Sequence, residues 1–218
     1  MKTETLVRSD RPVLLIGPVS VEREVFLDRL TPETLVVAAD GGADQALSMG
    51  VVPDFVIGDF DSYSGDARIP NDRRYPVAEQ DSTDFEKCLA RIEAPLVLAM
   101  GFLGRRIDHG LAVMSVLARF PAGTCILVSH DDVVVHCPNR IELDLAAETR
   151  VSLFPMAAVR GWSTGLNWPI EGIDFAPNGA IGTSNHATGP IQITMEGPGM
   201  LLILPPHALP KLEAALQN

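Results

Sequence analysis

Hydrophobic positions in the first half of the chain alternate between short apolar runs and amphipathic segments. β-Branched runs predict strands, and apolar residues three and four apart predict helices. The predicted strands are Val13–Ile16, Leu35–Ala38, Phe55–Ile57, Leu96–Ala99 and Cys125–Val128. The predicted helices are Val21–Leu30, Ala43–Met49, Phe85–Ile92 and Leu111–Phe120. This alternation predicts a mostly parallel sheet flanked by helices.

The pattern changes after His130, where short apolar runs are separated by Gly, Pro and Asn. The strands expected here are Val133–His136, Ile141–Leu145, Arg150–Phe154, Ile191–Met195 and Met200–Leu204, followed by a helix at Pro210–Leu216. Short strands with so little helix between them predict an antiparallel β-sandwich. We therefore expect an α/β domain over residues 1–130 and an all-β sandwich domain over residues 131–218.

An acidic motif, Gly58-Asp59-Phe60-Asp61-Ser62, directly follows one predicted strand. Aspartates two apart in an extended segment can face the same way, and hard oxygen ligands at a strand end suit Mg²⁺. The same residues are common in solvated turns, so the motif alone fits either interpretation.

A second acidic motif, Gln80-Asp81-Ser82-Thr83-Asp84, precedes a predicted helix. Asp81 is expected to cap this helix, and Asp84 is expected in its first turn. Helix N-termini favour acidic residues even without a ligand, so this motif also has a purely structural interpretation.

Two glycine-bearing turns follow other predicted strands, namely Asp40-Gly41-Gly42-Ala43 and the segment from Gly101 to His109. Glycine lets the backbone approach a phosphate, and arginine binds phosphate oxygens with two parallel hydrogen bonds. Neither turn matches a dinucleotide fingerprint or a P-loop. Because parallel strands end along one edge of a sheet, the four motifs together predict a metal-dependent site for a nucleotide polyphosphate.

Two motifs in the second half carry candidate ligand-binding groups. Trp168 can stack on a flat heteroaromatic ring, and Ser184 and Asn185 can hydrogen-bond to its polar edge. A core tryptophan and an ordinary β-turn would explain the same residues.

Charge and composition exclude some classes of partner. The chain has 218 residues and a net charge of −11, without the concentrated basic surface that nucleic-acid binding needs. Its three cysteines form no CxxC pair, which favours a reducing, cytoplasmic location. The apolar runs are too short for a membrane span.

Taken in order, these motifs resemble those of the thiamine pyrophosphokinase (thiamine diphosphokinase) family, over nearly the whole chain. The resemblance implies an α/β catalytic domain, a β-sandwich that helps to bind thiamine, and a homodimer with sites at the subunit interface. It also implies transfer of pyrophosphate from ATP to the thiamine hydroxyl, with Mg²⁺, giving thiamine diphosphate and AMP.

The family's site residues can be carried over by position. The resemblance implies Mg²⁺ ligands at Asp59, Asp61 and Asp84, with Gln80 and Asp81 near thiamine and the pyrophosphate. Asp81 is also a candidate acceptor for the hydroxyl proton. The implied ATP contacts are Gly41, Gly42, Arg106, Asp108 and His109, and the implied thiamine contacts are Trp168, Ser184 and Asn185. The chain departs from the family pattern at Arg105, where glycine is usual, and at His186, where an aromatic or acidic residue is expected.

Three other functions fit parts of the pattern. A diphosphokinase for another heterocyclic alcohol, such as 6-hydroxymethylpterin, would share the metal and phosphate site. The Asp59-x-Asp61 spacing also fits a metal-dependent phosphohydrolase with Asp59 as nucleophile. Such enzymes need a downstream lysine, and Lys87 is the only lysine between Lys2 and Lys211, which weighs against this class. A non-catalytic nucleotide or thiamine sensor would have the pockets without turnover.

Overall fold

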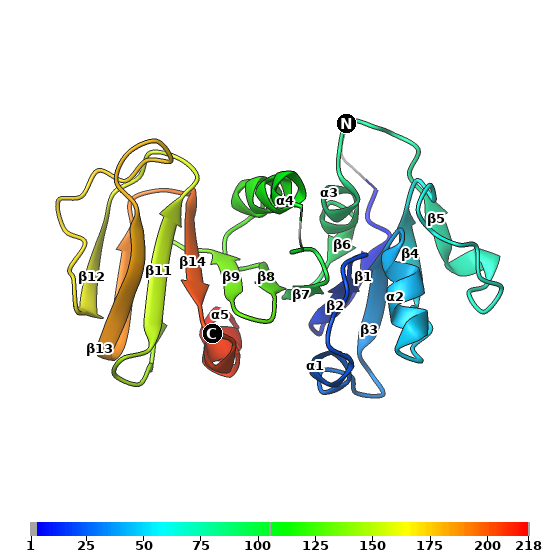
Figure 1. The fold of residues 1–218 in the computed structure, drawn as a ribbon, viewed down its shortest axis with the longest axis horizontal. Helices are drawn as coiled ribbons and strands as arrows, with labels where there is room; N and C mark the ends of the chain where they lie inside the picture. Colours follow the sequence, from blue (N-terminus) through cyan, green and yellow to red (C-terminus); the bar gives the residue numbers. More distant parts are fainter. Residues whose placement is uncertain (1–3, 105, 218) are drawn as a thin grey trace. The chain divides into compact units, whose positions relative to one another are not determined.

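The structure is a computed structural model that describes residues 4–104 and 106–217 (Figure 1). Contacts within the chain divide it into two compact units, Met1–Val116 and Leu117–Asn218. The division falls within helix α4 (Ile107–Arg119), one strand before the boundary predicted at residue 130. Arg105, one of the two departures from the family pattern, lies outside the described residues.

The first unit is built on a parallel sheet with the strand order β7-β2-β3-β4-β5. Every neighbouring pair in this order is parallel, and β2 and β7 are buried along their whole length. A separate parallel pair joins β1 to β6. The strands are β1 (Val7–Arg8), β2 (Val13–Ile16), β3 (Leu35–Ala39), β4 (Phe55–Gly58), β5 (Arg74–Pro76), β6 (Ile92–Glu93) and β7 (Val97–Met100).

Short helices pack against this sheet. Helix α2 (Gly42–Ser48) contacts β2 and β3, and α3 (Asp84–Leu89) contacts β3 and β4. Helix α2 comes unusually close to β2, because a Cβ at Gly42 would lie 2.2 Å from the carbonyl oxygen of Ile16. The helix therefore begins directly at the carboxyl ends of β2 and β3. The remaining helical segments of this unit are α1 (Arg23–Leu27), the 3₁₀ turn η1 (Asn71–Arg73) and the first part of α4.

The second unit consists of antiparallel strands in two sheets that share the long strand β13. The first part of β13 pairs with β11, and its later part lies between β10 and β12. Figure 1 shows β11 between β13 and β14. The elements are β8 (Cys125–Val128), β9 (Val133–His136), β10 (Arg140–Leu143), β11 (Arg150–Pro155), β12 (Gly161–Leu166), β13 (Gly182–Met195), β14 (Met200–Leu204), η2 (Pro206–Ala208) and α5 (Leu209–Leu216).

The predicted strands of the parallel sheet and of the second half are confirmed, most of them with small shifts at their ends. The strand predicted at Ile191–Met195 is only the last part of β13, which begins at Gly182. Four strands have no sequence prediction: β5 and β12 contain no apolar run, and β1 and β6 are only two residues long. In β12 the buried positions are mostly small residues, including Gly161 and Ser163. The helix predicted at Phe85–Ile92 ends at Leu89, and Ile92 instead begins β6. Helix α1 is shorter than the predicted Val21–Leu30, whereas α4 begins at Ile107 rather than Leu111. Among the described residues, no helix is long and apolar enough to cross a membrane.

Candidate functional site

Three aspartates meet at the carboxyl ends of β3 and β4. Asp40 directly follows β3, and Asp59 and Asp61 follow β4. The two strands are parallel neighbours, so their ends lie side by side. One carboxylate oxygen from each aspartate lies within 4.8 Å of the other two.

Asp40 is the buried member of this group, with 1% of its surface exposed. Its Oδ2 accepts a hydrogen bond from the Ser62 N–H at 3.1 Å, but its buried Oδ1 has no hydrogen-bond partner within residues 4–104 and 106–217. Burial raises the pKa of Asp40 to about 6, and the nearby Asp84 and Asp61 carboxylates act in the same direction, against the Ser62 hydrogen bond. Gly58 leaves room for this side chain, because a Cβ there would lie 2.7 Å from the Asp40 Cβ.

Lys87 connects two further carboxylates of the site. Its side chain is 2% exposed, and its ammonium donates to Asp59 Oδ2 at 2.9 Å and to Asp84 Oδ1 at 3.0 Å. Gln80 Nε2 donates to the same Asp59 oxygen at 3.0 Å. Asp59 therefore has one oxygen held by two donors.

The ionisation of these groups follows from the contacts. The Lys87 hydrogen bond is the main reason that the pKa of Asp59 is lowered. Burial raises the pKa of Asp84 and outweighs its bond to Lys87. Burial alone would lower the pKa of Lys87, but its hydrogen bonds to Asp59 and Asp84 together raise it. Lys87 is thus a buried, charged group that is paired with two carboxylates.

Helix α3 sets the position of both Asp84 and Lys87, which are three residues apart and therefore lie on one face. The N-cap is Thr83, whose side chain accepts a hydrogen bond from the Glu86 N–H at 3.3 Å. The prediction of Asp81 as N-cap is therefore wrong, because the Asp81 N–H instead donates to a Glu79 carboxylate at 3.0 Å, in the loop before the helix. The Asp81 side chain is exposed, and its catalytic role stays a prediction.

The acidic group fits a divalent cation. Buried polar atoms are nearly always paired, so the buried Asp40 Oδ1, which has no hydrogen-bond partner among the described residues, fits the role of a cation ligand. Carboxylate oxygens are the ligands that Mg²⁺ prefers, and the group supplies three of them within a small space. Asp84, the predicted third ligand, is connected to this group by Lys87, whose ammonium contacts both Asp84 and Asp59.

The predicted ATP residues lie at the starts of α2 and α4. Gly41 is the N-cap of α2 and Gly42 its buried first residue, which agrees with a close backbone approach. The exposed Arg106 guanidinium donates to both oxygens of Asp108, at 3.2 and 2.6 Å, and holds the pKa of Asp108 at about 2. His109 is exposed in the first turn of α4.

The predicted thiamine residues of the second unit form a small cluster. Buried Asn185 is tied to the backbone, because its Oδ1 accepts from the N–H of Trp168 (3.1 Å) and of His186 (2.9 Å), and its Nδ2 donates to the Trp168 carbonyl at 2.7 Å. The Trp168 side chain, 57% exposed, meets the His186 ring edge-on at 5.1 Å. Ser184 is exposed and has a left-handed φ of 63°. Asn185 thus shapes the Trp168 loop.

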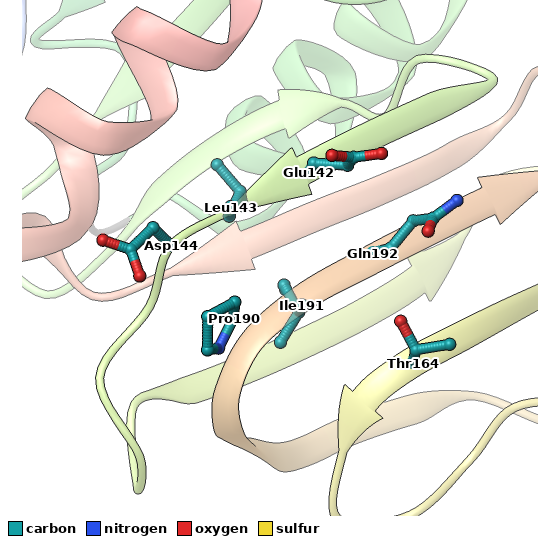
Figure 2. A pocket seen from close by; sticks show the side chains of 7 residues that line it. All are labelled: Glu142, Leu143, Asp144, Thr164, Pro190, Ile191 and Gln192. Atoms are coloured by element: carbon teal, nitrogen blue, oxygen red, sulfur yellow. The ribbon is translucent and has the colours of Figure 1, made fainter.

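A hollow of about 400 Å³ lies elsewhere on the second unit (Figure 2). Glu142, Gln192 and Thr164 line it in register from β10, β13 and β12. Its other lining residues are Leu143, Asp144, Pro190 and Ile191. None of the predicted site residues contributes to it.

Sequence reasoning missed two residues of the acidic site, Asp40 and Lys87. The signals were present, since Asp40 opens the Gly-Gly turn and Lys87 lies one helical turn after Asp84. Lys87, the single lysine between Lys2 and Lys211, directly contacts Asp59, so a lysine is present at this site. The burial of Lys87 could not be predicted, because a single lysine in an amphipathic helix usually lies on the exposed face.

Fold and site together define an α/β protein whose second unit is built mainly of antiparallel strands, with a carboxylate site suited to a divalent cation. The family model for the catalytic domain of thiamin pyrophosphokinase matches residues 27–128. Thiamine pyrophosphokinase 3 of Oryza sativa subsp. japonica is 30% identical over 197 residues, covering 73% of this chain and 74% of that protein. The chain belongs to the thiamine pyrophosphokinase family.

Other relatives agree with this assignment. Thiamine pyrophosphokinase 2 of Oryza sativa subsp. japonica is 28% identical over 219 residues, covering 81% of this chain and 80% of that protein. The solved thiamin pyrophosphokinase of Candida albicans has a TM-score of 0.73 at 14% identity and covers 93% of each chain. That of Geobacillus thermodenitrificans has a TM-score of 0.70 at 20% identity, covering 89% of this chain and 96% of the other. These two structures share the fold.

Proposed function

We propose that the protein transfers pyrophosphate from ATP to the hydroxyl of thiamine, giving thiamine diphosphate and AMP. One observation carries the proposal beyond the family name: the partnerless buried Asp40 Oδ1 lies among carboxylates at the strand ends. A polyphosphate substrate needs bound positive charge at such a site, and a divalent cation supplies it.

Asp59 and Asp61 are the proposed Mg²⁺ ligands, together with Asp84, which the family resemblance implies. The geometry adds Asp40 to this set. When bound, Mg²⁺ neutralises charge on the phosphate groups during transfer. The chain's own contribution is to hold these carboxylates in place, which Lys87 does for two of them.

The remaining residues of the first unit would orient the substrates. The backbone at Gly41 and Gly42 is suited to phosphate approach, and Arg106 can exchange Asp108 for a phosphate with the same bidentate geometry. His109 completes the proposed ATP contacts. Gln80 and Asp81, in the loop before α3, are proposed to lie near thiamine, with Asp81 as the acceptor of its hydroxyl proton. Such positioning supplies much of the rate in phosphoryl transfer.

The two units correspond, in this proposal, to an α/β catalytic domain and a β-sandwich domain that helps to bind thiamine. Trp168 is exposed and can stack on a thiamine ring, with Ser184 and Asn185 nearby. The active form is proposed to be a homodimer with sites at the subunit interface. The three free and buried cysteines support a cytoplasmic location.

The test is to incubate the purified protein with ATP, Mg²⁺ and either thiamine or 6-hydroxymethylpterin, and to measure AMP. We expect AMP only with thiamine. An Asp59→Asn variant should lose activity by a factor of about 100 or more while it still binds thiamine. Exposed Asp72 in η1 offers the matched control, because Asp72→Asn removes a carboxylate outside the acidic group.

Each alternative has its own outcome. AMP release with the pterin but not with thiamine would replace the substrate in this proposal. The contact of Lys87 with Asp59, together with the Asp59-x-Asp61 spacing, favours a phosphohydrolase, and phosphate release with a phosphoaspartate on Asp59 would establish that class. Thiamine binding without turnover in either form would indicate a sensor.

A further inference from the structure

The acidic site contains its own fixed positive charge. Four carboxylates, those of Asp40, Asp59, Asp61 and Asp84, influence one another's ionisation or share contacts. The Lys87 ammonium lies between two of them, Asp59 and Asp84, and the Lys87 side chain is 2% exposed. A buried lysine is rare unless it is paired, and here both pairings are made at normal hydrogen-bond distances.

The Lys87 ammonium bridges the carboxylates of Asp59 and Asp84. It contacts one oxygen of Asp59 and one oxygen of Asp84, as a metal ion shared by two carboxylates would. Gln80 donates to the same Asp59 oxygen, so this oxygen is fully used by protein donors. The other oxygen of Asp59, Oδ1, accepts the Asp61 N–H at 3.3 Å, and one Asp59 oxygen lies within 4.8 Å of a carboxylate oxygen of Asp40 and of Asp61.

The charges of the site also favour a single divalent ion beside Lys87. Four carboxylates carry more negative charge than one divalent ion can offset, and sites of this kind often bind two metal ions. One divalent ion together with the Lys87 ammonium leaves a single excess negative charge. The rigid helical spacing between Asp84 and Lys87 keeps the ammonium in place without any ligand.

We propose that Lys87 takes the place of a second divalent cation between Asp59 and Asp84, so that the protein by itself binds a single cation at the acidic site. The inference deepens the proposed function, because it concerns the metal of the same site. Lys87 is a positioning residue in this account: it directs Asp59 and Asp84 and does not touch substrate.

The experiment counts bound Mn²⁺ on the full chain without any substrate, from the loss of the free-ion signal in electron paramagnetic resonance. Wild type is expected to bind one ion per chain. Lys87→Met removes the charge at nearly constant volume and should raise the count to two, whereas Lys87→Arg keeps the charge and should leave it at one. A count of two in the wild type, or an unchanged count in folded Lys87→Met, overturns the proposal.

Controls separate this result from misfolding and from the proposed function. Lys211→Met removes an exposed lysine of the second unit, which pairs with Asp144, and should not change the count. If Lys87→Met does not fold, Lys87→Gln provides a polar uncharged replacement with the same expected count of two. The ion count needs no catalysis, so a wild type that binds one ion but releases no AMP with thiamine contradicts only the proposed function.

Discussion

Replacing Asp40 by asparagine should stabilise the protein at neutral pH when no divalent cation is present. Asparagine keeps an oxygen that can accept the Ser62 N–H, and it tolerates the left-handed φ of 43° at this position. It also removes a buried charge whose Oδ1 has no partner. The difference in the free energy of unfolding between Asp40→Asn and wild type therefore measures how much the buried Asp40 charge destabilises the protein.

The magnitude follows from the pKa of Asp40, which is raised from 3.8 to about 6. Between these values the folded chain keeps a proton that the unfolded chain has lost, so this position makes stability fall as the pH rises. The full cost is reached above the folded pKa and corresponds to about 3 kcal/mol. At a pH below 3.8 both states are protonated and the cost disappears.

The assay is urea unfolding of wild type and Asp40→Asn, followed by far-ultraviolet circular dichroism, at about pH 4 and about pH 7.5 with chelator. The variant should be more stable by about 3 kcal/mol at the higher pH and by much less at the lower one. Added Mg²⁺ should stabilise wild type more than the variant, because the variant has lost a ligand. Asp72→Asn, which changes an exposed aspartate, serves as the control.

Two results would refute this reasoning. One is a stability difference between Asp40→Asn and wild type that does not change with pH. The other is an equal gain in stability from Mg²⁺ in both proteins, which would show that the Asp40 carboxylate does not contribute to cation binding. Because other titrating groups are common to both proteins, their effects largely cancel in the comparison.

Three further substitutions test single contacts. Gly58→Ala should destabilise the protein in urea by about 1–3 kcal/mol, because the new Cβ would lie 2.7 Å from the Asp40 Cβ; an unchanged midpoint would contradict this. Thr83→Ala removes the N-cap of α3 and should cost about 1 kcal/mol in the same assay, and a neutral result would show the cap to be dispensable. His186→Ala removes the ring that packs edge-on against Trp168 and should raise the KM for thiamine by up to about tenfold, whereas His186→Phe keeps a ring there and should restore the KM. Equal KM values in wild type and both variants would exclude a role of His186 in positioning Trp168.

The parallel sheet of the first unit could be predicted because its strands are buried on both faces. Such strands are continuous apolar runs, and β2, β3, β4 and β7 all follow this rule. The motifs that follow the strands then identified the family. Strands β5 and β12 could not be predicted, since β5 is an edge strand and β12 buries mainly small residues.

At the site, the sequence by itself determined that Asp59, Asp61 and Asp84 occur at a strand end and a helix start, because local patterns define these positions. Only the tertiary structure decided that Asp40 is buried with a partnerless oxygen and that Lys87 joins Asp59 to Asp84. The physical reason is that burial and pairing depend on groups brought together from distant parts of the chain. The sequence shows that Asp40 opens a Gly-Gly turn and that Lys87 lies one helical turn after Asp84, but it does not show which distant groups surround them.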